Sequence, residues 1–173
     1  MSVGRISPTK RQLDVVHAFA FARDKVPAAI LYIVGKPALK EDVRYLERIK
    51  EYIRKQKIEA QVKFLDAIPN KKMPPIYQKA AVTVNMSETG SLDKDVLEAL
   101  SCGIPALTTN IAFKGVIPEV LIVEDGDAIG ERLTAFLEEG PHKEKEMEYR
   151  NLVVRAHSLG RLISNLISDM QIV

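Results

Sequence analysis

Residues 81–108 have the sequence Ala81-Val82-Thr83-Val84-Asn85-Met86-Ser87-Glu88-Thr89-Gly90-Ser91-Leu92-Asp93-Lys94-Asp95-Val96-Leu97-Glu98-Ala99-Leu100-Ser101-Cys102-Gly103-Ile104-Pro105-Ala106-Leu107-Thr108. The run from Ala81 to Met86 is typical of a strand buried on both faces of a parallel sheet. Leu92 to Cys102 has the composition and spacing of a helix, and Gly103 is well placed as its C-terminal cap. Because Ile104 to Thr108 then predicts another strand, the stretch indicates one strand–helix–strand unit of an α/β fold.

The same alternation continues on both sides of this unit. Residues 2–6 are expected to be the end of a strand that runs into a loop, and further strands are expected at residues 28–34, 62–65 and 121–123. Helices are expected from Pro8, over 41–57 and 74–79, with two or three more within 127–170. The pattern predicts a Rossmann-like three-layer αβα sandwich, with a mainly parallel sheet of about six strands and right-handed crossovers. Ligands of such sheets bind at the carboxyl ends of the strands, so the loops that begin at Gly4, Gly35, Leu65, Ser87 and Thr109 are the ones to search.

Bulk properties narrow the classes of protein. The 173 residues, 46% apolar and 28% charged, fit one domain that builds its own core. A net charge of +2 gives no support for a nucleic-acid partner. The single cysteine excludes an intrachain disulfide, and His17, His142 and His157 lack metal-ligand spacing, so we expect neither a metal nor a cofactor.

The sequence also bears on location and completeness. No apolar run is long enough to cross a bilayer, and residues 1–5 do not form a signal peptide, which favours a cytoplasmic protein. The chain begins inside the expected first strand. We therefore expect a domain taken from a longer protein, or one half of a two-chain enzyme.

The first candidate site is the loop from Gly4 to Arg11. Gly4 permits a sharp turn after the strand, and Arg5 and Lys10 leave the same strand-to-helix connection. Two cations beside the free N–H groups of a helix start suit a diphosphate. The alternative is an ordinary solvated basic loop.

The second candidate site follows the strand that ends at Met86. A small polar loop contains Ser87, Gly90 and Ser91, and a helix is expected to start near Ser91 or Leu92. Backbone N–H groups of Gly90, Ser91 and Leu92 could cradle a phosphate, and Glu98 could accept hydrogen bonds from two ribose hydroxyls. From spacing alone, a solvated or salt-bridged Glu98 is the competing interpretation.

Several segments together resemble the C-terminal domain of family 4 glycosyltransferases, in that family's order along the chain. They are Gly4-Arg5 with Lys10, Leu31-Tyr32-Ile33-Val34-Gly35, Val62-Lys63-Phe64-Leu65, Tyr77-Gln78-Lys79-Ala80-Ala81-Val82, and Ser87 onward through the specific run Leu97-Glu98-Ala99-Leu100-Ser101-Cys102-Gly103-Ile104-Pro105. The resemblance covers most of residues 1 to about 125. It implies one half of a GT-B fold, in which residues 1–173 bind the nucleotide sugar and an absent N-terminal domain binds most of the acceptor.

The resemblance also implies roles for particular residues. Arg5 and Lys10 would be catalytic, since they hold the diphosphate and neutralise the leaving group without a metal. Glu98 matches the second glutamate of the family's Glu-x7-Glu motif, which holds the ribose. The base would lie near Ala67, Ile68 and Pro69. The remaining donor-binding positions would be Gly4, Ser87, Gly90, Ser91, Leu92 and Lys94.

Two positions depart from the family pattern. Gly90 stands where the first glutamate is expected, with Glu88 two positions away, and Asp66 stands where glycine is frequent. We hypothesise that backbone N–H groups of residues 90–92, helped by Lys94, contact the phosphates or the sugar in place of that glutamate.

The expected function is retaining transfer from a nucleoside-diphosphate sugar (UDP or GDP) to a sugar, lipid-linked or polysaccharide acceptor. The isolated domain would be inactive. The alternatives are a sugar-nucleotide epimerase of the same fold and a non-catalytic Rossmann-like binding module. The family is compatible with a cytoplasmic location or with peripheral association of the full-length enzyme at the inner face of the cell membrane.

Overall fold

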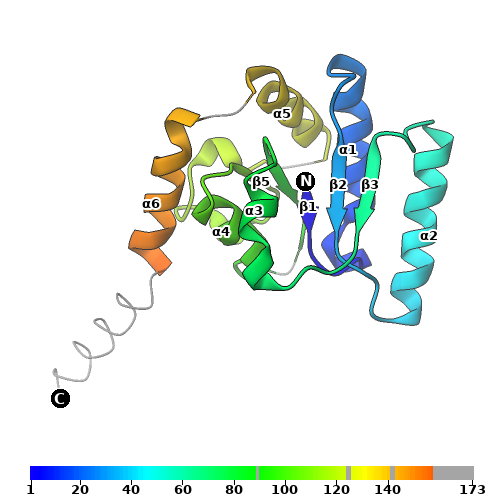
Figure 1. The fold of residues 1–173 in the computed structure, drawn as a ribbon, viewed down its shortest axis with the longest axis horizontal. Helices are drawn as coiled ribbons and strands as arrows, with labels where there is room; N and C mark the ends of the chain where they lie inside the picture. Colours follow the sequence, from blue (N-terminus) through cyan, green and yellow to red (C-terminus); the bar gives the residue numbers. More distant parts are fainter. Residues whose placement is uncertain (89, 124–125, 141–142, 158–173) are drawn as a thin grey trace.

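The computed structural model describes residues 1–88, 90–123, 126–140 and 143–157. Strands and helices alternate along the chain (Figure 1). The strands are β1 (Ser2–Val3), β2 (Leu31–Val34), β3 (Val62–Leu65), β4 (Thr83–Asn85) and β5 (Ala106–Thr108). The α-helices are α1 (Gln12–Lys25), α2 (Lys40–Lys55), α3 (Pro74–Tyr77), α4 (Lys94–Ser101), α5 (Gly126–Glu139) and α6 (Glu146–His157). Short 3-10 turns are η1 (Pro8–Lys10), η2 (Asn70–Lys72), η3 (Ile111–Phe113), η4 (Glu119–Leu121) and η5 (Lys143–Lys145).

The strands pair in parallel, as the sequence predicts. β1, β2 and β3 form one ladder and β4 and β5 another. Met1 joins the two ladders, because its ammonium donates to the Val82 carbonyl at 2.8 Å and its carbonyl accepts from the Val84 N–H at 2.8 Å. The strand order across the molecule is therefore β3-β2-β1-β4-β5, and the α/β prediction is confirmed.

Two groups of helices cover this sheet. α1 packs against both α2 and α5, whereas α4 packs against α3 and α6 (Figure 1). Between them lies a core of aliphatic side chains from the strands and the inner helix faces, such as Ile33, Val84, Leu107, Val16 and Leu100. All carboxyl ends of the parallel strands consequently meet at one edge of the sheet.

The expected sixth strand at residues 121–123 is wrong. Residues 119–121 form the turn η4, and the following segment makes only one isolated bridge, Thr108 to Ile122, with the Val123 N–H donating to the Thr108 carbonyl at 2.8 Å. The described residues contain five strands in all. Leu121 and Val123 are buried in the core, so the short apolar run reflects packing and not a strand.

Element boundaries differ from the sequence expectations at both candidate loops. The turn η1 ends at Lys10 and is followed by Arg11, whose φ of 51° lies in the left-handed region, and α1 begins only after Arg11. α4 begins at Lys94 with Asp93 as its N-cap residue, two to three positions later than expected. Gly103 follows α4 with a φ of 81°, and its N–H donates to the Leu100 carbonyl at 2.9 Å, which confirms its capping role.

Two helices, α5 and α6, occupy the described part of the C-terminal region; residues 158–170 of the predicted helices lie outside the described residues. Within the ranges that the structure describes, every helix is too short or too polar to pass through a lipid bilayer.

Candidate functional site

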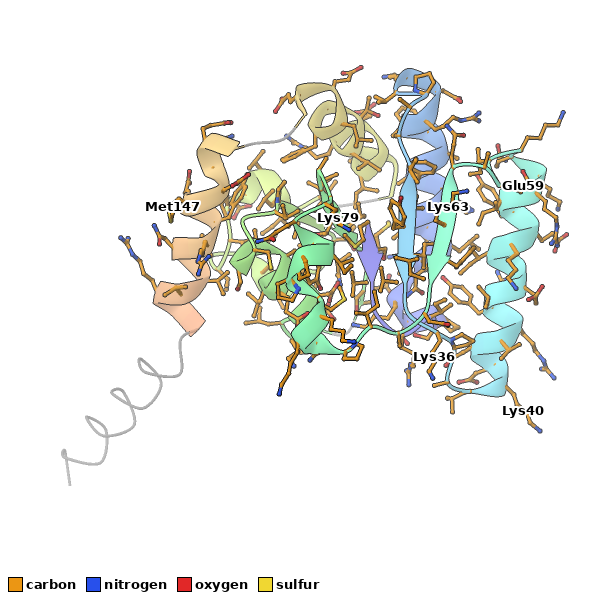
Figure 2. All side chains as sticks on the ribbon, in the orientation of Figure 1. Lys36, Lys40, Glu59, Lys63, Lys79 and Met147 are labelled. Carbon is orange, nitrogen blue, oxygen red and sulfur yellow. The ribbon has the colours of Figure 1, made fainter. Side chains whose placement is uncertain are left out.

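Positive charge gathers at the carboxyl edge of the sheet. Four of the five connections that leave this edge carry cations: Arg5, Lys10 and Arg11 after β1, Lys36 after β2, Lys71 and Lys72 after β3, and Lys114 after β5. After β4 the first cation is Lys94, at the start of α4. Figure 2 shows Lys36 and Lys40 at this lower edge, with Glu59 at the opposite end of the strands. An edge built in this way suits an anionic ligand.

The loop after β1 is held by its neighbours. A Cβ on Gly35 would lie 1.9 Å from the Gly4 carbonyl oxygen, so only glycine allows the loops after β1 and β2 to approach this closely. The buried Gln12 side chain braces the same loop, because its amide donates to the Arg5 carbonyl at 2.9 Å and accepts from the Ser7 N–H at 3.2 Å. The backbone that presents Arg5 is thus fixed before any ligand arrives.

Arg5 itself is only loosely held. Its side chain is 53% exposed, and its Nε lies 3.9 Å from Oδ2 of Asp42. Asp42 is buried at the start of α2, where it accepts from the N–H groups of Ala38 and Leu39, each at 3.1 Å. The guanidinium of Arg5 is therefore available to a ligand at the edge between β1 and α2.

Lys10 is held on the opposite side of the loop. Its ammonium donates to the carboxylate of Asp93 and lies 3.4 Å from the hydroxyl of Ser87. Both partners follow β4 and are buried. The structure thus brings Lys10 and Ser87 together, while Arg5 pairs with a different element.

A network of buried polar groups lies beneath Lys10. The Asn110 amide donates to Asp93 at 2.9 Å and to the Ser91 carbonyl at 2.7 Å. Asn110 in turn donates from its backbone N–H to the Thr108 hydroxyl at 3.0 Å, and that hydroxyl lies 3.2 Å from the Asn85 amide oxygen. Because the members are satisfied within the network, Asp93 and the lysine above it are held in position.

The glycine-containing loop after β4 is open to solvent. Gly90 has a φ of 69°, a conformation that favours glycine, and Gly90, Ser91 and Leu92 are all exposed. Lys94, also exposed, is the first residue of α4. Exposed backbone and a cation at a helix start match the predicted phosphate or sugar contact, which stays a prediction.

Glu88 does not point freely toward this loop. Its carboxylate pairs with Arg11 at 2.5 Å, and Arg11 also holds Asp14 at 2.6 Å. The loops after β1 and β4 are therefore joined by two ion pairs, one through Lys10 and one through Arg11.

Asp95, in the first turn of α4, faces the strand beneath it. Both of its carboxylate oxygens accept from the Asn85 amide, at 3.0 and 3.2 Å. Burial raises the pKa of Asp95 to about 6, although the bond from Asn85 opposes this shift. Asp95 therefore supports the site from below.

Glu98 lies one turn farther along α4 and is half-buried. The hydroxyl of Tyr77 donates to its Oε2 at 3.1 Å. Glu98 forms no salt bridge within the described residues, although part of its side chain remains in contact with solvent. Its contact with ribose stays a prediction.

The expected base-binding residues follow β3. Ala67 is exposed and Ile68 is partly buried against the core, with Asp66 exposed before them. They share the carboxyl edge with the other predicted residues, since β3 lies beside β2 in the same parallel ladder.

Sequence reasoning missed the residues that hold the site in place: Gln12, Tyr77, Asn85, Asp93, Asp95 and Asn110. One signal is present in the sequence, because Asn85 is a polar residue in a strand that is buried throughout. Among the histidines, His17 packs on Tyr52 with ring centroids 4.2 Å apart, and His142 lies outside the described residues. In the part of the chain that the structure describes, no group of His, Cys, Asp or Glu side chains is placed to hold a metal ion.

Solved structures share this fold. Anabaena Alr3699/HepE in complex with UDP matches with a TM-score of 0.83 and 15% identity, over 99% of this chain and 48% of that one. Staphylococcus aureus TarM, crystallised with UDP and other ligands, matches with a TM-score of 0.81 and 14% identity, over 96% of this chain and 34% of that one. The present chain therefore spans half or less of the length of these two proteins.

A third structure is of similar size. The catalytic domain of cholesterol-α-glucosyltransferase from Helicobacter pylori matches with a TM-score of 0.73 and 20% identity, over 90% of this chain and 98% of that one. Together these likenesses establish the fold as that of a GT-B glycosyltransferase domain.

Curated protein sequences contain no match to this chain. The family model described as "Glycosyl transferases group 1" matches residues 1–151, which include every predicted site residue. On this match, the chain belongs to the group 1 glycosyltransferases.

Proposed function

We propose that this chain is the donor-binding domain of a retaining glycosyltransferase and that it binds a nucleoside-diphosphate sugar at the carboxyl edge of its sheet. One observation carries the proposal: Lys10 is fixed between the loops after β1 and β4, on the same side of the sheet as Glu98. A cation and a half-buried carboxylate on adjoining elements suit the two ends of a nucleoside diphosphate. UDP is the nucleotide bound in the HepE and TarM structures, and we infer it as the first candidate here.

Each end of the donor has a proposed partner. Lys10 and Arg5 would contact the diphosphate from two sides, with the backbone N–H groups of residues 90–92 and Lys94 completing the anion site. Glu98 would accept hydrogen bonds from the ribose hydroxyls. The base would lie over Ala67 and Ile68.

The chemistry follows from these contacts. When the bond between the anomeric carbon and the diphosphate oxygen breaks, negative charge develops on the departing phosphate. Cations that are already in position stabilise this charge without reorganising, which lowers the barrier. We propose that Arg5 and Lys10 do this without a metal. The acceptor hydroxyl oxygen would attack the anomeric carbon from the face that the diphosphate leaves, and the departing phosphate oxygen would take the hydroxyl proton, so the configuration of the sugar is retained.

Transfer would require a second domain. We propose that an N-terminal acceptor-binding domain closes over this edge and that residues 1–173 alone bind the donor without transferring the sugar. We further propose a cytoplasmic protein that acts on a sugar, lipid-linked or polysaccharide acceptor. The basis is the family match together with the length of the HepE and TarM chains.

A thermal-shift assay tests donor binding. A ligand that binds the folded state raises the melting temperature by mass action, so we expect UDP, GDP or ADP to raise that of the 173-residue chain, and excess EDTA to leave the increase unchanged. If all three nucleotides at millimolar concentration leave the melting temperature unchanged, the donor-domain proposal is wrong. If EDTA abolishes the increase, binding requires a metal.

A further inference from the structure

A buried tyrosine lies beside the predicted ribose site. Tyr77 ends the short helix α3 and is 1% exposed, so its ring is enclosed by the core. Its hydroxyl reaches out of the core and donates to Oε2 of Glu98 at 3.1 Å. Sequence reasoning gave Tyr77 no part in the site.

The direction of this hydrogen bond is fixed. Burial, with the nearby carboxylates of Glu98 and Asp95, raises the pKa of Tyr77 above its ordinary value. The phenol therefore keeps its proton, and Glu98 must accept. Because the Tyr77 ring is packed in the core, its hydroxyl has a fixed position. The hydrogen bond therefore favours the one rotamer of Glu98 that places Oε2 next to this hydroxyl.

We propose that Tyr77 is a positioning residue: it holds Glu98 so that Oε1 and the free lone pair of Oε2 face the two ribose hydroxyls of the donor. Among the described residues, Oε1 of Glu98 has no hydrogen-bond partner, so it is available to a ligand. A glutamate that is already ordered loses little side-chain freedom when a ligand binds. The proposal rests on the donor-binding function proposed above.

The prediction is a loss of selectivity for ribose, not a general loss of affinity. Calorimetry on the full 173-residue chain should show that UDP binds more tightly than 2′,3′-dideoxy-UDP, which lacks both hydroxyls. Tyr77→Phe keeps the ring and removes the hydroxyl. We expect this variant to lower the affinity for UDP about fivefold, which is the usual effect of one lost hydrogen bond. The affinity for the dideoxy nucleotide should stay unchanged.

A matched control separates positioning from stability. Tyr45 is also buried, and its hydroxyl accepts from the Leu13 N–H at 2.8 Å. Tyr45→Phe removes a comparable buried hydroxyl away from Glu98 and should keep the wild-type ratio of the two affinities. In a Glu98→Ala background, Tyr77→Phe should have no further effect on UDP, because the partner through which it acts is gone.

The outcomes distinguish the two proposals. If Glu98→Ala abolishes the preference for UDP but Tyr77→Phe retains it, positioning by Tyr77 is wrong and the ribose assignment stands. If Glu98→Ala retains the preference, or if the wild-type chain binds neither nucleotide, the ribose site itself is wrong and the inference falls with it. If Tyr77→Phe lowers the melting temperature and weakens both nucleotides equally, the role of Tyr77 is structural only.

Discussion

Arg5 and Lys10 leave the same loop, yet they lie in contrasting surroundings. Arg5 faces α2, is 53% exposed and approaches Asp42 only to 3.9 Å. Lys10 faces β4 and α4, is 25% exposed, and donates to a buried aspartate that Asn110 also holds. Arg5 is therefore a largely solvated cation at the edge of the site, whereas Lys10 forms an ion pair with a buried carboxylate inside the site.

The contrast shows that a shared proposed ligand does not imply a shared structural role. Lys10 balances a buried charge, so the fold depends on it even without a donor. Arg5 balances little in the free protein, so its charge remains available to the diphosphate. A substitution of Arg5 should therefore change donor binding without changing stability, whereas a substitution of Lys10 should change both.

The largest effect on UDP affinity should come from Lys10→Met. The variant removes a diphosphate contact and leaves the Asp93 carboxylate buried without its cation. We expect UDP affinity to fall about 50-fold. The free energy of unfolding should fall by about 2 kcal/mol, less than for a fully buried pair because Lys10 is partly exposed. Calorimetry and urea unfolding measure the two effects.

A double variant tests the cause of the instability. Lys10→Met with Asp93→Asn removes both charges, so stability should recover while UDP affinity stays low. If Lys10→Met alone is as stable as the wild type, the lysine does not balance a buried charge and the contrast with Arg5 disappears.

These two sides also differ in how far sequence predicts them. Apolar runs and helical periodicity are local signals, and they predict the strands and α2. Arg5 and Lys10 are predicted because they lie in a strand-to-helix loop. The roles of Asp93 and Asn110 are not predictable in this way, since the bonds from Lys10 to Asp93 and from Asn110 to Asp93 join separate elements and form only when β1, β4 and β5 align. The expectation of a strand at residues 121–123 is wrong for a related reason. An apolar run indicates burial, and Leu121 is buried in the core without pairing in a sheet.

The second prediction concerns Asp95, which lies on the Lys10 side. Because burial raises its pKa to about 6 from an ordinary 3.8, this carboxyl binds a proton more tightly in the folded chain than in the unfolded chain. Its contribution to stability is therefore full below about pH 4, is lost as the pH rises to about 6, and stays lost above. Asp95→Asn, which stays neutral, should be more stable than the wild type by about 2–3 kcal/mol at pH 7.5.

Urea unfolding at pH 4, 5, 6 and 7.5 checks this, and the advantage of Asp95→Asn should vanish at pH 4. Asp24→Asn serves as the control, since its side chain is 71% exposed and should give a nearly constant difference. An advantage of Asp95→Asn that is independent of pH would contradict the raised pKa.

The smallest effect on stability, and the clearest separation, should come from Arg5→Ala. An exposed cation 3.9 Å from its partner contributes little to folding, so the free energy of unfolding should change by less than about 0.5 kcal/mol. UDP affinity should still fall about tenfold, because a charge-assisted phosphate contact is lost. Uridine, which has no phosphate, should bind equally well to both proteins.

Arg44→Ala, an exposed position on α2, controls for the loss of one surface charge. Equal losses for UDP and uridine would place Arg5 outside the diphosphate site and leave Lys10 as its cation on the β1 loop.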